Sequence, residues 1–119
     1  MGYHRESAVH RVLSVYFDGR VRFEPADSHT DSALDIDFEG FVSNSPVRIG
    51  IQVKPLSAKA LTGSMSVSDR AKANFYKYEN RHGGKVFLVH TRKRAREEVI
   101  VNESDLINNI NNFLLSLGK

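Results

Sequence analysis

Two short segments of the chain carry polar side chains that could act together. The run RIGIQVKP alternates apolar and polar residues, so Gln52 and Lys54 project from the same face of a strand. The earlier run LDIDFEGFV alternates in the same way and sets Asp35, Asp37 and Glu39 on one face. Carboxylates gathered near a buried strand repel one another and need a cation to offset that repulsion and their desolvation. Lys54 supplies one positive charge, and a divalent metal would supply more.

The two runs are joined by SNSP, which is typical of a turn, so they predict an antiparallel hairpin. If both apolar faces pack on the same core, the hairpin loop must have an even length, and this fixes the register. The expected cross-strand pairs are Phe38–Ile51, Ile36–Val53, Asp37–Gln52 and Asp35–Lys54.

A second interpretation is that the polar face of this hairpin is an ordinary solvent-exposed surface. In that case Asp35 and Lys54 form an exposed ion pair that contributes about 0–1 kcal/mol. Two observations favour a site instead. Lys54 leads into a crossover, which places its strand inside the sheet, and Glu6 lies beside the apolar stripe of the first helix, where it could reach the same sheet edge.

The remaining segments predict an α/β fold with a mixed central sheet flanked by helices. A strand, a helix and a further strand in sequence indicate a right-handed crossover between parallel strands. The expected elements are a helix over 3–17, a strand over 21–23, a polar loop at ADSHTDS, strands over 34–42 and 47–54, a helix from Ser68 to about His82, a strand over 85–90, a short strand over 99–101 and a helix capped by Ser104.

Composition sets the broad class of the protein. The chain has 119 residues, of which 40% are hydrophobic, and this predicts a single domain over residues 1–119. It contains no cysteine, which excludes disulfides and thiolate chemistry and fits a reducing compartment. Neither a membrane span nor a secretory signal is visible, so we expect a cytoplasmic protein with no membrane partner. The net charge of +3 permits a polyanionic partner without requiring one.

The order of elements, an aspartate on the second strand and Gln-x-Lys on the third together resemble the PD-(D/E)xK nuclease superfamily, which has the restriction-endonuclease fold. Gln52-x-Lys54 is similar to the Gln-x-Lys of Mrr-type nucleases, and Gly2-Tyr3-x-x-Glu6 resembles the start of their first helix. The short chain is also similar to archaeal Holliday-junction resolvases, although those usually carry Glu-x-Lys. The resemblance implies an αβββαβ core. The chain has no Pro-Asp, so either Asp35 or Asp37 must take that place.

The resemblance also implies roles for the residues. Asp37 would be the principal ligand of Mg²⁺ or Mn²⁺, Gln52 would add a neutral oxygen, and Glu6 would contact the metal directly or through water. Lys54 would orient the attacking water or stabilise charge on the phosphate. We expect Asp37 rather than Asp35 to hold the metal because the register sets Asp37 opposite Gln52. Asp35 remains open between a catalytic role and a partner of Lys54.

Other chemical groups give weaker signals. The run TRKRAR is basic, and Arg92, Lys93, Arg94 and Arg96 would suit phosphate contacts, or they form a solvated face. The five histidines form no local metal pair, and we expect His10 on the surface. Asn74 and Tyr78 echo the Gln-x-x-x-Tyr spacing of some RecB-like nucleases, although a core position explains Tyr78 better.

The sequence therefore predicts a metal-dependent DNA endonuclease, restriction- or resolvase-like, that acts as a homodimer or as a subunit of a larger restriction or repair system. The alternative is a catalytically inactive nuclease-fold domain that serves in nucleic-acid binding or protein interaction. Gln52 keeps this alternative open because an amide makes the site less negative than a carboxylate would.

Overall fold

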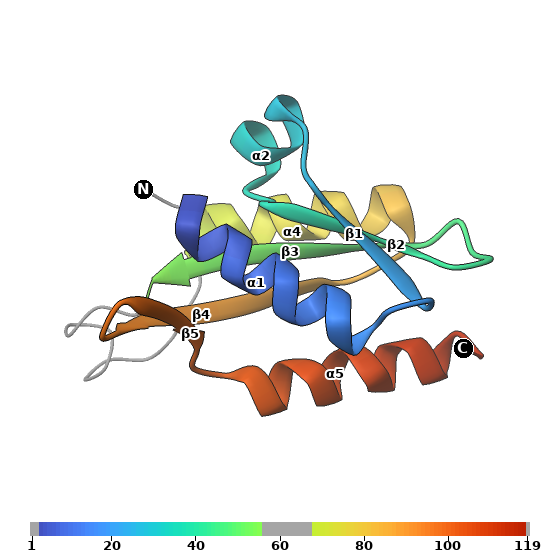
Figure 1. The fold of residues 1–119 in the computed structure, drawn as a ribbon. Coiled ribbons are helices and arrows are strands. Elements are labelled where there is room, and N and C mark those ends of the chain that lie inside the picture. Colours follow the sequence, from blue (N-terminus) through green and yellow to red (C-terminus); the bar gives the residue numbers. More distant parts are fainter. Residues whose placement is uncertain (1–2, 56–67, 119) are drawn as a thin grey trace.

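The computed structural model describes residues 3–55 and 68–118, which form a five-stranded sheet with helices on both faces (Figure 1). The strands lie in the order β1-β2-β3-β4-β5, and only β3 and β4 run parallel. None of the helices in this described part is long and apolar enough to cross a membrane. The elements are α1 (Tyr3–Tyr16), β1 (Val21–Pro25), α2 (Ser28–Leu34), β2 (Phe38–Val42), β3 (Arg48–Pro55), α4 (Asp69–His82), β4 (Val86–Arg94), β5 (Glu97–Ile100) and α5 (Glu103–Ser116). The predicted α/β class with a mixed sheet is confirmed.

The main apolar core lies between the sheet and the layer formed by α1 and α5 (Figure 1). Helix α4 covers the opposite face, and the short helix α2 packs beside α4. Burial of one apolar face of each strand and one stripe of each helix drives this layering. The buried core residues are Val9, Leu13, Phe17, Val21, Phe23, Phe38, Val42, Ile49, Ile51, Phe87, Val89, Leu106, Ile110 and Leu114.

Helix α4 begins and ends where the sequence predicts. The Ser68 hydroxyl accepts a hydrogen bond from the Ala71 N–H at 3.1 Å, which satisfies one of the free donors of the first turn. At the other end Gly83 adopts the left-handed conformation that closes the helix, with φ 67°. The helix connects the parallel strands β3 and β4, as the expected crossover requires.

The segment before β2 differs from the prediction. The polar stretch expected to be a loop forms helix α2, because the Asp27 carboxylate caps it by accepting from the Thr30 N–H at 2.7 Å. Asp35 ends this helix in the left-handed region, with φ 59°, so the strand begins at Phe38 rather than at Leu34.

The expected pairing of Ile36 with Val53 is therefore wrong. Ile36 lies outside the strand and is fully buried. It lies against Gly50 and Tyr78, on the face of the sheet that α4 covers. Its burial fills the space between α4 and the sheet, where Gly50 has no side chain of its own.

Three other boundaries also move. Strand β4 continues through the first part of the basic run as far as Arg94, because β5 pairs with it there. The last helix begins at Glu103, so Ser104 lies inside it and does not cap it. Helix α1 ends at Tyr16, one residue before its expected end; Tyr16 is 52% exposed, whereas Phe17 just beyond it is fully buried.

A close approach between the α4–β4 connection and β3 requires glycine at position 84. A Cβ on Gly84 would lie 1.6 Å from the Arg48 carbonyl oxygen. We expect Gly84→Ala to lower the free energy of unfolding by at least about 2 kcal/mol, because the backbone must move apart. Gly19→Ala is the control: Gly19 has φ 80° and open space around it, so its cost is only the backbone term of about 1 kcal/mol. Urea unfolding compares the two, and equal stability would contradict the close-packing explanation.

Candidate active site

Asp37 joins the start of β2 to the end of β3. Its N–H donates to the Ile51 carbonyl at 2.8 Å, and its Oδ2 accepts from the Val53 N–H at 2.6 Å. These two bonds lie on either side of Gln52. The predicted pairing of Phe38 with Ile51 is confirmed, and Phe38 is the last residue of β2 that pairs in this register. The expected ladder pair of Asp37 with Gln52 is not part of this register. Asp37 lies just before β2 and instead bonds Ile51 and Val53, the two neighbours of Gln52.

The environment of Asp37 disfavours its ionised form. The pKa of the carboxyl is raised to about 6, and burial is the largest cause. The bond from the Val53 N–H opposes this rise, and the negative charges of Glu6, Asp31 and Asp35 contribute to it. A carboxylate surrounded by other carboxylates is a place where a cation would be stabilised.

Gln52 is buried, with 7% of its surface exposed, and its Oε1 has no hydrogen-bond partner among the described residues. A buried amide oxygen without a donor costs on the order of 1–3 kcal/mol. The other such atom in the described part of the chain is the Thr91 hydroxyl oxygen. Thr91 lies on β4, whereas Gln52 lies between the two residues that Asp37 contacts. The residue that carries this unpaired acceptor therefore lies between the two residues that Asp37 bonds.

Lys54 follows Gln52 on β3 and pairs with His90 of the parallel strand β4. Burial first, and then the positive charge of Lys54, lowers the pKa of His90. Within residues 3–55 and 68–118, the ion pairs are Arg22–Glu24 and Arg48–Glu39. The salt link from Asp35 to Lys54 that the alternative interpretation requires is thus not formed there.

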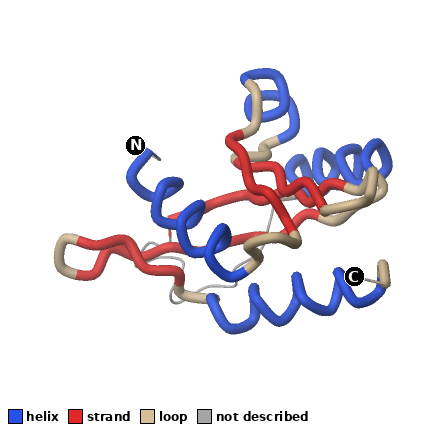
Figure 2. The backbone as a smooth tube through the Cα atoms, turned by 45° about the vertical axis from the view of Figure 1, so that its right-hand side comes forward, coloured by secondary structure: helices blue, strands red, loops and turns tan. Residues whose placement is uncertain are grey.

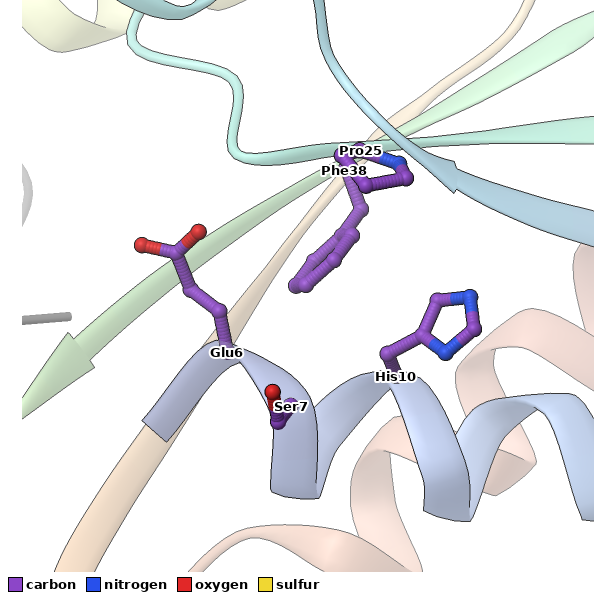
Figure 3. A pocket seen from close by; sticks show the side chains of 5 residues that line it. All are labelled: Glu6, Ser7, His10, Pro25 and Phe38. Carbon is purple, nitrogen blue, oxygen red and sulfur yellow. The ribbon is translucent and has the colours of Figure 1, made fainter. Parts of the chain in front are cut away.

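Glu6 approaches the site from helix α1. It lines a cavity of about 490 Å³ together with Ser7, His10, Pro25 and Phe38. Figure 3 shows the Glu6 carboxylate and the His10 ring rising from one side of α1, with the Phe38 ring between them. The electrostatic effect of Glu6 on Asp37 shows that α1 brings this carboxylate towards the β2–β3 junction.

His10 is not the surface residue that the sequence suggests. It is half-buried, and its Nε2 lies 2.8 Å from the Phe23 carbonyl oxygen, so this nitrogen carries the proton and donates. Its ring lies against Phe38, with 5.6 Å between the ring centroids. These contacts fix one wall of the cavity next to Glu6.

Asp35 is not opposite Lys54 on a strand, because it belongs to the end of α2. Its Oδ2 accepts from the Asn74 Nδ2 at 2.7 Å, which ties α2 to α4. Asn74 is buried, and the sequence offered only its four-residue spacing from Tyr78 as a signal. This spacing places both side chains on the same face of α4, which packs against the sheet.

Glu39, the third acidic residue of the predicted face, is engaged in a buried network. Its Oε2 accepts from the Tyr78 hydroxyl at 2.8 Å and from the Arg48 Nη1 at 3.2 Å. Burial and the bond to Glu39 raise the pKa of Tyr78. Tyr78 is fully buried, as expected for a core residue. Glu39 therefore anchors α4 to the sheet.

The four residues of the basic run lie on the hairpin of β4 and β5, whereas Asp37 lies just before β2. Arg92, Lys93 and Arg94 belong to β4, and Arg96 lies in the turn that follows. All four are exposed.

The described residues contain no group of three or more Asp, Glu, His or Cys side chains that converge as metal ligands. Mg²⁺ commonly uses only one or two carboxylates and completes its shell with water and phosphate oxygens. Comparison with models of protein families gives no match, and neither curated proteins nor solved structures match the chain significantly. The site therefore has to be interpreted from its own geometry.

The raised pKa of Asp37 makes folding stability depend on pH. Because the folded protein holds this proton up to about pH 6, whereas the unfolded chain releases it near 3.8, stability falls as pH rises through that window. We expect Asp37→Asn, which can still accept from the Val53 N–H, to raise the melting temperature near pH 8 and to change it little near pH 4. The matched control is Asp18→Asn at an exposed position, which should leave the melting temperature unchanged at both pH values. A fall in melting temperature near pH 8 would contradict the assignment of a destabilising charge.

Proposed function

We propose that this chain is a metal-dependent nuclease that hydrolyses phosphodiester bonds in DNA. The observation that carries the proposal is that two unfavourable groups occur at the same junction of β2 and β3. The buried Gln52 Oε1 has no donor among the described residues, and Asp37, which bonds both neighbours of Gln52, lies in an environment that disfavours its charge. One divalent cation would relieve both, because it accepts a lone pair from the amide oxygen and offsets the carboxylate charge.

The fold supports the same proposal. The order α1, β1, β2, β3, α4, β4 contains the αβββαβ core that the resemblance to restriction-endonuclease-like nucleases implies, with α2 inserted before β2. Asp37 lies immediately before the second strand, and Gln-x-Lys lies in the last part of the third. Fold alone does not determine activity, so the proposal rests on the site.

The donor set fits Mg²⁺ or Mn²⁺. Asp37 and Gln52 would hold the ion through oxygen, and Glu6 would contact it directly or through water. When bound, such an ion supplies positive charge for the phosphate and lowers the pKa of its water. Asp37 is fixed by three bonds, because the Ala26 N–H also donates to its carbonyl at 3.0 Å. This rigidity would keep the carboxylate in place without further ordering on binding.

Lys54 would act on the substrate. Within the described residues its ammonium forms no ion pair, and its strand position is two residues beyond Gln52. A positive charge held there would stabilise the phosphate as negative charge develops on it. Asp35 would tune the electrostatics of the site, because its carboxylate is bonded to Asn74 and its charge acts on Asp37.

A single chain offers one such site, whereas duplex DNA has two strands. We therefore propose that two copies act on one duplex, as a homodimer or within a larger restriction or repair assembly. The second candidate function is a catalytically inactive domain of the same fold that binds nucleic acid or protein. Gln52 favours it, because an amide adds no negative charge to hold the ion.

The direct test is incubation of the protein with supercoiled, linear, single-stranded and branched DNA, in Mg²⁺, in Mn²⁺ and in chelator. We expect metal-dependent cleavage of at least one form, and Asp37→Ala should abolish it because the anionic anchor of the ion is removed. Thermal unfolding provides a separate readout: Mn²⁺ should raise the melting temperature of the parent but not of Asp37→Asn. No cleavage of any DNA form, with no metal-dependent shift, would support the inactive domain.

Two further variants separate the roles of the Gln-x-Lys pair. Lys54→Ala should lower turnover by on the order of 10²–10³, with a much smaller change in DNA affinity, because the charge acts as the phosphate is attacked. Gln52→Glu should tighten Mg²⁺ binding if position 52 contacts the ion, since a carboxylate replaces an amide. Single-turnover cleavage and a Mg²⁺ titration measure these effects. A Lys54→Ala protein that cleaves as fast as the parent would exclude the proposed role.

A further inference from the structure

The hairpin formed by β4 and β5 extends from the body of the protein as an arm (Figure 2). Its turn lies beyond the N-terminal end of α1, away from the apolar core. Ala95 in this turn adopts the left-handed conformation, with φ 56°, which reverses the chain within two residues. We call residues 91–100 the arm.

The register shows which side chains of the arm share a face with the candidate site. Lys54 pairs with His90, and alternate residues of a strand project from the same face. Arg92 and Arg94 therefore continue the face that carries Lys54, whereas Lys93 projects from the other. A hollow of about 320 Å³ agrees with this arrangement, because Arg92 and Arg94 line it together with Val99 and Val101.

The positive charge of the arm is not neutralised within the described part of the structure. Lys93 pairs with Glu98, and Arg94 with Glu97, as strand neighbours. Even so, neither pair forms an ion pair within 4 Å. The exposed cationic groups of the arm thus remain available to an external anion. A polymer with phosphates spaced along its backbone can contact both arginines, which are separated by one residue on the same face.

We propose that the face of the arm formed by Arg92 and Arg94 binds the sugar–phosphate backbone of duplex DNA and guides it towards Lys54. The arm, residues 91–100, contains no aromatic side chain, so it lacks the stacking platform typical of single-strand binding. The two guanidiniums over an apolar floor suit phosphate oxygens, which arginine binds through paired N–H donors. This proposal rests on the nuclease proposal for the identity of the polymer.

The test measures binding without cleavage. Fluorescence anisotropy in chelator follows a labelled duplex of about 20 base pairs over a range of salt concentrations. Arg92→Gln/Arg94→Gln should weaken binding by at least tenfold and reduce the log–log salt slope by about 1.8, or about 0.9 for each phosphate that the variant no longer binds. Lys93→Gln removes one charge from the opposite face and should leave the slope unchanged; Arg92→Gln alone is its single-charge counterpart.

The outcomes separate this proposal from the proposed function. If the double variant loses DNA affinity but the parent cleaves no DNA, the proposal that the arm binds DNA is supported and the nuclease proposal fails. If the parent cleaves DNA and the double variant binds with an unchanged slope, the arm is only a solvated surface. If Arg92→Gln and Lys93→Gln change the salt slope equally, the assignment of DNA binding to the Arg92–Arg94 face would be overturned. Tighter binding of single-stranded than of duplex DNA, or competition by polyglutamate at equal charge concentration, would overturn the duplex backbone as the partner.

Discussion

The hydrogen bond from the Val53 N–H to the Asp37 carboxylate is the contact on which the candidate site depends. A β-strand needs an acceptor for each N–H, and here a side chain supplies it where β2 begins. The bond holds a carboxylate at the junction of two strands, in a partly buried position where its charge is costly. The same bond that completes the sheet therefore sets up an electrostatic environment that a cation would satisfy.

Helix α4 maintains this junction from the face opposite the main core. Its Tyr78 hydroxyl bonds Glu39, and its Asn74 amide bonds Asp35. Both acceptors lie on the chain segment that contains Asp37, one before it and one after it. Acidic residues in neighbouring positions thus play different roles: Glu39 secures the packing of α4, Asp35 ends α2, and Asp37 lies just before β2, where it bonds β3.

Charge is unevenly distributed over the molecule, and this unevenness would suit the proposed polyanionic substrate. The negative charges of Glu6, Asp31 and Asp35 act on Asp37, whereas the arm presents arginines along the continuation of the Lys54 face. Acidic groups alone would repel a phosphate, so the proposed nuclease activity would need a cation at the carboxylates and fixed positive charge along the path of the polymer. Strand β3, which carries Gln52 and Lys54, lies between these two regions, because it pairs with β2 on one side and with β4 on the other.

The sequence by itself determined the mixed α/β class, the crossover from β3 through α4 to β4, and the register of β2 on β3. Each of these follows from local signals: period-two alternation, the Ser68 cap and Gly83. The period-two alternation predicted a second strand that begins too early, at Leu34. The cap at Asp27 and the left-handed turn at Asp35 favour a short helix there, and hydrophobic periodicity does not reveal it. Only the tertiary structure decided which hydrogen bonds each carboxylate forms. The bonds of Asp35 to Asn74 and of Glu39 to Tyr78 join residues 39 positions apart, and such long-range contacts leave no periodic trace in the chain. Burial likewise raised the pKa of Asp37, together with the charges of Glu6 on α1 and Asp31 on α2, against the opposing bond from Val53 on β3.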